Sequence, residues 1–230
     1  MGAADSSVSR ERFLLEEIGQ PAIALQVQRP AVLASGDVVY VHGATFGADL
    51  SIFYRFDGRS WADALNDIGL AVWGFDFPGY GRSERYPADL ERPAGRIGDA
   101  IAHLRRVVAA VRARNGDRPV CLVAHSWGGA VAGRVPPSVA TPTGPLADIG
   151  ALWSGQALYD PSLVVAPTLL ARGEWDSLCT DADAQRLLSA LGAALKEDAK
   201  IERATHLMHL ELQRTVLHDR VNRFLQRTAQ

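Results

Sequence analysis

Short runs of apolar and β-branched residues recur along the chain, and turn-forming residues separate them. Runs of about four to eight such residues are typical of strands that are buried on both faces of a parallel sheet. Near the start, Gly19-Gln20-Pro21 lies between two weaker runs, a pattern that predicts two short antiparallel strands at a sheet edge. The strands predicted in this way span residues 12–18, 22–28, 37–41, 70–75, 120–124 and 164–170, with further candidates at 149–153 and near Ile201.

Between these runs, apolar residues recur every three or four positions, which places them on one face of a helix. In the longest such stretch, Ile101, Leu104, Val108 and Val111 share a face, and Asn115-Gly116 ends the pattern. Strands that alternate with helices favour an α/β fold, in which a mainly parallel, twisted sheet has helices on both faces. The helices predicted in this way span residues 59–68, 97–114, 127 to about 134, 181–194 and 213–226.

Composition and charge narrow the classes of protein to which the chain can belong. Its 230 residues are 47% hydrophobic and 22% charged, values ordinary for a globular protein of one domain. A net charge of −2 gives no electrostatic reason to expect nucleic acid or an anionic membrane as a partner. No segment resembles a membrane span or the apolar core of a signal peptide. We therefore expect a cytoplasmic protein with a disordered tail at 1–10 and a single domain at 11–230.

One stretch, residues 122–129, joins an apolar strand directly to a helix rich in small residues. Ser126 lies at the junction, with Ala124 two positions before it and Gly128 two positions after it. A serine exposed on a sharp strand-to-helix turn needs small residues at both places, because strand and helix nearly touch there. Glycine is usual two positions before the serine, and Ala124 is also a small residue. The alternative is that Ser126 is an ordinary helix N-cap.

Serine is a weak nucleophile near neutral pH and needs a base that a third group orients. Asp176 and His206 each follow a later predicted strand, so the three groups come in the order Ser126, Asp176, His206. In parallel α/β sheets, sites lie at the carboxyl ends of strands, where these residues are expected. Other residues compete for the two supporting roles: Glu174, Asp181 and Asp183 for the acid, and His209 for the base.

The chain resembles the α/β-hydrolase fold superfamily over about residues 10–228. Each motif is weak alone, but together they come in the expected order. The matching motifs are His42-Gly43, Asp76-x-Pro78-Gly79-x-Gly81-x-Ser83, residues 125–129, Gly173-Glu174-x-Asp176, and Thr205-His206 followed by Glu211.

The resemblance implies a catalytic triad and an oxyanion hole. Ser126 would attack a carbonyl carbon, His206 would take its proton, and Asp176 would orient the imidazole. The backbone amides of Ala44 and Trp127 would stabilise the oxyanion. No metal or organic cofactor is implied, and the two cysteines of the chain form no metal or redox spacing.

Other residues near these loops have expected roles in structure or in substrate binding. His42 is expected to shape the oxyanion loop by hydrogen bonding, and Asp76 to cap local amides. Aromatic residues indicate an apolar pocket for a medium, partly hydrophobic substrate. The substrate-binding candidates are Thr45, Phe46, Trp153 and Trp175, although the Thr45 hydroxyl could instead bond within its own turn.

The region after the turn at Ser126 departs from the family pattern. Similar hydrolases continue the helix, return through another strand and often insert a helical cap, whereas residues 135–148 contain four prolines. The sequence therefore predicts a short or absent cap within residues 135–160. An exposed apolar patch left by a missing cap could drive homo-oligomer formation.

The leading functional prediction is a serine hydrolase that cleaves a small-molecule ester, lactone or thioester through an acyl-enzyme. Two alternatives stay open on the sequence. One is hydrolysis of a C–C bond with the same triad. The other is a non-catalytic ligand-binding protein that has kept the fold, because fold alone does not prescribe function.

Overall fold

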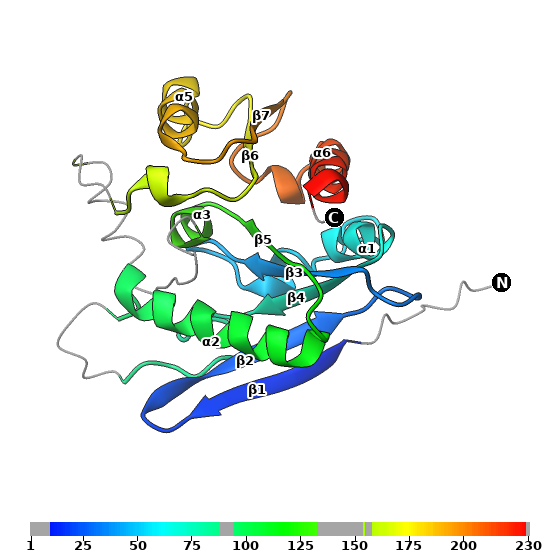
Figure 1. The fold of residues 1–230 in the computed structure, drawn as a ribbon, viewed down its shortest axis with the longest axis vertical. Coiled ribbons are helices and arrows are strands. Elements are labelled where there is room, and N and C mark those ends of the chain that lie inside the picture. Colours follow the sequence, from blue (N-terminus) through cyan, green and yellow to red (C-terminus); the bar gives the residue numbers. More distant parts are fainter. Residues whose placement is uncertain (1–9, 88–93, 133–153, 155–157, 229–230) are drawn as a thin grey trace.

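The computed structural model describes residues 10–87, 94–132, 154 and 158–228, and Figure 1 shows their arrangement. Five strands form one sheet in the order β1-β2-β4-β3-β5. Pairing is antiparallel within β1-β2-β4 and parallel within β4-β3-β5, so the antiparallel edge predicted from the sequence is confirmed. The strands are β1 (Glu11–Glu17), β2 (Gln20–Gln28), β3 (Gly36–Val41), β4 (Leu70–Phe75) and β5 (Val120–Ala124).

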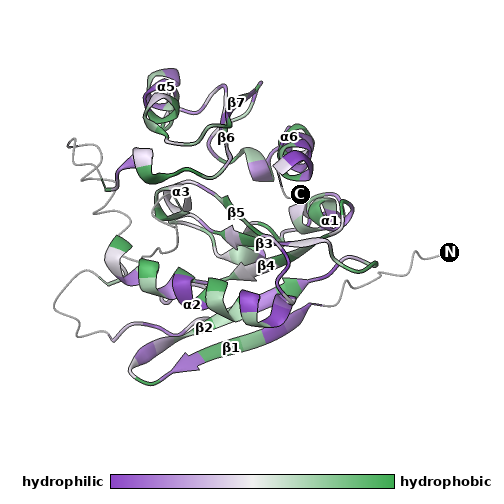
Figure 2. Cartoon of the chain, viewed as in Figure 1, coloured by the Kyte–Doolittle hydropathy of each residue, from purple (hydrophilic) through white to green (hydrophobic). Residues whose placement is uncertain are grey.

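Helices cover both faces of this sheet, as predicted (Figure 1). Successive residues of a strand point to opposite faces, so Val39 packs with α2 and α3 on one side, and Val38 packs with α1 and α6 on the other. Figure 2 shows that α2 and α6 each carry hydrophobic and hydrophilic residues, as helices with one buried face do. The helices are α1 (Trp61–Asn66), α2 (Ile97–Asn115), α3 (Trp127–Ala132), α5 (Asp181–Ala190) and α6 (Arg214–Thr228).

Two further strands, β6 (Thr168–Gly173) and β7 (Lys196–Ile201), form a separate parallel pair. Ile201 and Ala204 bury their side chains in the same core as α1 and α6, which joins this pair to the rest of the domain. The strand expected at 149–153 lies outside the described residues. In the expected cap region, 135–160, the described residues are 154 and 158–160.

The boundaries of three elements differ most from those predicted, and the other differences are of one or two residues at an end. β6 begins four residues late, directly after Pro167, whose missing N–H cannot join a ladder. α5 ends at Ala190, before Gly192, where any side chain would collide with the carbonyl oxygen of Ser162. β7 comes before Ile201 and ends there; most of its residues are charged because only Ala199 and Ile201 are buried.

The amino-terminal end of the described region is anchored by Arg10, whose guanidinium pairs with the carboxylate of Asp49. The tail predicted at 1–10 otherwise lies outside the described residues. None of the helices found in the described part of the chain combines the length and the apolarity that a membrane crossing requires.

Candidate active site

Ser126 follows β5 directly and has a backbone φ of +56°, a left-handed conformation that few residues other than glycine adopt. An N-cap residue has extended φ and ψ instead, so the backbone argues against the N-cap alternative. Gly128 permits the turn, because a Cβ there would collide with the carbonyl oxygens of Val41 and His42. Strain of this kind costs about 1 to 3 kcal/mol and is commonly found at functional sites.

The side chains of Ser126, His206 and Asp176 form a continuous hydrogen-bonded chain. His206 Nε2 lies 2.8 Å from Ser126 Oγ, and His206 Nδ1 lies 2.8 Å from Asp176 Oδ2. A carboxylate only accepts, so Nδ1–H donates to Asp176 and the lone pair of Nε2 faces the serine hydroxyl. This is the imidazole tautomer that can remove the hydroxyl proton.

Asp176 is held by its own loop. Its side chain is 2% exposed, and Oδ1 accepts hydrogen bonds from the backbone N–H groups of Leu178 (2.8 Å) and Cys179 (3.0 Å). These two donors fix the carboxylate and leave Oδ2 for His206. The structure thus places a buried, oriented acid behind the imidazole.

The loops that carry Asp176 and His206 are joined by backbone contacts between the ends of β6 and β7. The Glu174 N–H donates to Ile201 O and the Trp175 N–H donates to Ala204 O, each at 2.8 Å. Gly173 permits this approach, because a Cβ there would collide with the Ala204 carbonyl oxygen. The pairing of β6 with β7 therefore sets the relative position of Asp176 and His206.

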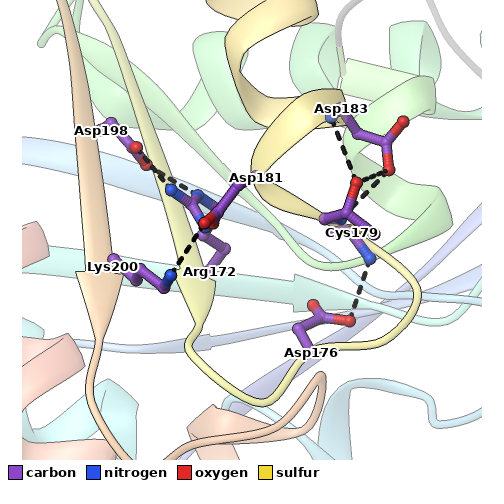
Figure 3. A network of polar contacts seen from close by, with 8 residues as sticks. Arg172, Asp176, Cys179, Asp181, Asp183, Asp198 and Lys200 are labelled. Carbon is purple, nitrogen blue, oxygen red and sulfur yellow. Dashed lines mark hydrogen bonds and ion pairs between the residues drawn. The ribbon is translucent and has the colours of Figure 1, made fainter.

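The competing acids are engaged elsewhere, and Figure 3 shows Asp181 and Asp183 apart from Asp176. Glu174 accepts a hydrogen bond from the Arg203 N–H. Asp181 pairs with Arg172 and Lys200. Asp183 forms a capping box with Thr180 at the start of α5.

The competing base, His209, lies in a 3-10 turn, η3 (Met208–Leu210), and is 5% exposed. Its ring packs 4.1 Å from that of His125, centroid to centroid, and tilts against Trp61 at 6.5 Å. Burial lowers the pKa of His209 to about 2, so it stays neutral at ordinary pH. Of the two histidines, it is therefore His206 that meets Ser126.

His42 is completely buried and orients the loop expected to form the oxyanion hole. The Phe77 N–H donates to His42 Nε2 at 3.0 Å, which leaves the ring proton on Nδ1, 2.7 Å from the Gly43 carbonyl oxygen. Burial lowers the pKa of His42, which keeps this neutral form. Because the C=O and N–H of a trans peptide point in opposite directions, holding the Gly43 carbonyl fixes the direction of the Ala44 N–H.

This loop lies directly against the turn at Ser126. A Cβ on Gly43 would come within 3.1 Å of Ser126 Cβ, so only glycine fits without a shift. The Tyr80 hydroxyl donates to the Ala44 carbonyl oxygen at 2.9 Å, a contact that the sequence did not suggest. The side chain of Trp127 packs on Phe77, and the residue is 3% exposed. Trp127 can therefore meet a substrate only through its backbone N–H, at the start of α3.

Asp76 caps local amides, as expected. Its carboxylate accepts from the Ala48 N–H at 2.9 Å and from the Arg82 N–H at 3.0 Å. Side chains at Gly47 or Gly81 would collide with that carboxylate. The Asp-x-Pro-Gly-x-Gly motif therefore shapes the loop that carries Tyr80.

The candidate substrate-binding residues differ in exposure. Thr45 is exposed and Phe46 is half-buried, both just after the oxyanion loop. Trp175, next to Asp176, is 59% exposed. Trp153 lies outside the described residues. Of the described candidates, two therefore follow the loop of Gly43 and Ala44 and one adjoins Asp176, and each is at least partly exposed.

Two side chains near the site carried no signal that sequence reasoning could use. His125 lies 81 positions from His206, yet its Nε2 is 3.0 Å from the His206 carbonyl oxygen. Cys179 belongs to no sequence motif, but it lies close to two candidate residues. The ligand atoms of Asp176, Cys179 and His206 all lie within 4.8 Å of one another. The sequence led us to expect no metal site, and this cluster is one that a metal ion could use.

Comparisons with known proteins agree with this architecture. A model of the Alpha/beta hydrolase family matches residues 38–228. No curated protein matches the chain in sequence. An esterase from Pyrococcus furiosus is similar in structure, with a TM-score of 0.73, 17% identity, and coverage of 98% of this chain and 93% of that one.

Two further solved structures show the same fold. An alpha-beta serine hydrolase homologue from Coxiella burnetii has a TM-score of 0.65 and 19% identity, over 94% of this chain and 97% of its own. The esterase domain of a Rhodothermus marinus protein has a TM-score of 0.67 and 16% identity, over 96% and 100%. These likenesses show the fold, and the family match over most of its length shows that the chain belongs to the alpha/beta hydrolase family.

Proposed function

We propose that the protein is a serine hydrolase that cleaves a carboxylic ester, lactone or thioester through an acyl-enzyme. The observation that carries the proposal is the Ser126–His206–Asp176 chain, with two contacts of 2.8 Å and the serine on a left-handed turn. The esterases among the structural neighbours are consistent with this class of reaction but do not define the substrate.

In the proposed first step, Ser126 Oγ attacks the carbonyl carbon while His206 Nε2 takes the hydroxyl proton. Asp176 stabilises the imidazolium and keeps its orientation. The imidazolium then gives the proton to the leaving group, and the acyl group stays on Ser126. Water attacks this acyl-enzyme with His206 again as the base, which releases the acid and restores the serine.

The developing oxyanion would be stabilised by the N–H groups of Ala44 and Trp127. Loss of one such donor typically costs about 2.7 to 4 kcal/mol in the transition state, so the orientation of the loop matters. His42 and Tyr80 support this role, because they hold the carbonyls on either side of the Ala44 N–H. The residues present thus supply a nucleophile, a base and an electrostatic cradle, and we propose that no cofactor takes part.

The described substrate-binding candidates indicate a class of substrate. Thr45, Phe46 and Trp175 offer a partly apolar surface that suits a medium, partly hydrophobic acyl or lactone group.

Two alternative functions remain. A C–C bond hydrolase would use the same triad. A binding module, in contrast, has no need for a base in the correct tautomer beside a strained serine.

Hydrolysis of p-nitrophenyl esters of increasing acyl length tests the proposal. We expect turnover by the natural chain, loss of at least about a thousandfold in Ser126→Ala, and retention in Ser189→Ala. Ser189 is a matched control because it is an exposed serine on α5. Equal rates for the natural chain and Ser126→Ala, or no turnover from folded protein, would contradict the proposal.

A further inference from the structure

The loop between β6 and α5 folds Cys179 back towards the carboxylate of Asp176. Both the Leu178 and the Cys179 N–H groups donate to Asp176 Oδ1, which closes a tight turn around that oxygen. Figure 3 shows Cys179 beside Asp176 at the start of α5. The Cys179 residue is exposed and forms no disulfide.

His206 adds a third donor from another loop. Its Nδ1 lies 2.8 Å from Asp176 Oδ2, and the ligand atoms of Asp176, Cys179 and His206 lie within 4.8 Å of one another. Thiolate sulfur, imidazole nitrogen and carboxylate oxygen are the three ligand types that Zn²⁺ takes in proteins. Two ligands of a tetrahedral zinc ion lie roughly 3.5 Å apart, so small side-chain rotations would close the cluster around an ion.

An ion can approach two of these ligands from a cavity of about 310 Å³ beside β6. Asp176, Cys179 and Glu174 line it, as do Arg172 and Lys200. The positive charges are already paired: Arg172 with Asp198 and Asp181, and Lys200 with Asp181 (Figure 3). Ser126 is not among the described residues that line the cavity. Entry from this side would leave the surface around Ser126 free for substrate.

We propose that Asp176, Cys179 and His206 bind a zinc-like divalent cation that switches hydrolysis off. The switching effect rests on the proposed function, whereas ion binding rests on the geometry alone. Water would complete the tetrahedral coordination.

The inhibition follows from the tautomer of His206. An ion on Nδ1 displaces the proton there, and a neutral imidazole then carries its proton on Nε2. With Nε2 protonated, the ring has no lone pair for the hydroxyl proton of Ser126. The Cys179 thiol also gives up its proton, so that one proton is released in total: two leave, from sulfur and Nδ1, and one is taken up at Nε2.

The kinetic test is titration of ester hydrolysis with Zn²⁺, with each variant compared with its own metal-free rate. We expect kcat of the natural chain to fall at least tenfold with KM unchanged, and chelation with EDTA to restore it. In Cys179→Ala and Cys179→Ser, half-inhibition should need at least tenfold more Zn²⁺. Cys121→Ala is the matched control, because Cys121 lies on β5 outside the cluster, and it should behave as the natural chain does.

The binding test is independent of activity. Co²⁺ added to the Ser126→Ala protein should give a thiolate-to-cobalt charge-transfer band that both Cys179 variants lack. That result with no ester hydrolysis by the natural chain would uphold the ion site and contradict the proposed function. A missing band would overturn the ion site. Zn²⁺ inhibition that is equal in the natural chain and the Cys179 variants would overturn the switch.

Discussion

His125 Nε2 donates a hydrogen bond to the backbone carbonyl oxygen of His206, 3.0 Å away. His125 precedes Ser126 in sequence, so this bond joins the turn at Ser126 to the loop that carries His206. The ring of His125 also packs on His209, and its Nδ1 lies close to Gly43. One partly buried imidazole therefore joins the turn at Ser126 to two other loops of the candidate site, those of Gly43 and of His206.

Removal of this bond should slow the reaction without weakening substrate binding. We expect His125→Phe to lower kcat about tenfold, since a hydrogen bond of this kind contributes about 1 kcal/mol and a mispositioned base costs further. KM should change little. His125→Gln, which keeps a donor near Nε2, should recover most of the rate. Full kcat in His125→Phe would show that the bond does not position His206.

The Tyr80 hydroxyl offers a test of the oxyanion loop. Tyr80→Phe removes the donor to the Ala44 carbonyl oxygen and keeps the ring that packs on His42. We expect kcat to fall about fivefold, which corresponds to about 1 kcal/mol, while the denaturant midpoint shifts little. Tyr54→Phe is a matched control because Tyr54 is 45% exposed, and the change should alter neither quantity. An unchanged kcat in Tyr80→Phe would show that its hydrogen bond to Ala44 does not orient this loop for the reaction.

Buried histidines should make the fold sensitive to acid. Burial lowers the pKa of His209 to about 2 and those of His103, His125 and His218 to about 4. In the unfolded chain these side chains have pKa values near 6.5, so the unfolded state binds more protons once the pH falls below that value. Stability is therefore present above about pH 6.5 and is lost as the pH falls towards the folded-state pKa values.

Urea unfolding at a series of pH values measures this linkage. Each such histidine contributes a slope of about 1.4 kcal/mol per pH unit between its two pKa values, so His209→Leu should reduce the total slope below pH 6 by that amount. Between pH 7 and 8 neither state gains a proton at these groups, and the natural chain and variant should have equal slopes. Parallel stability curves at acid pH would show that His209 is not neutral when folded.

Arg172 should stabilise the framework that holds Asp176. Its guanidinium is nearly buried and donates two hydrogen bonds to the carboxylate of Asp198 on β7, at 3.0 and 2.8 Å. We expect Arg172→Met to lower the free energy of unfolding by about 2 kcal/mol. Arg227→Met removes an exposed ion pair with Glu197 and should cost less than about 1 kcal/mol. Equal losses in the two variants would contradict a structural role for Arg172.

The sequence predicted the elements that are uninterrupted apolar runs or clearly amphipathic. β4 and β5 have the predicted bounds because their residues form uninterrupted apolar runs, and α2 ends within one residue of its prediction, before Gly116. The start of β7 was not predicted, because a pairing with β6 alone leaves Lys196, Glu197 and Lys200 free to be charged. The pattern of apolar residues predicts a strand only where its side chains are buried, and most side chains of β7 are exposed or only partly buried.

The sequence also predicted which residues could react, but not what supports them. Ser126, Asp176 and His206 were found by motif and chain order. The contact of His125 with His206 and the approach of Cys179 to Asp176 depend on how loops meet in space, which no local pattern encodes. The cytoplasmic location and the homo-oligomer stay predictions from the sequence.

The most direct test of the central claim is covalent labelling of the nucleophile. A fluorophosphonate should form one adduct per chain, and peptide mass spectrometry should locate it on Ser126. Labelling should be strongly slowed in His206→Ala, because the hydroxyl then has no base. An adduct on another residue, or none on folded protein, would contradict the assignment of Ser126 as the nucleophile of this hydrolase.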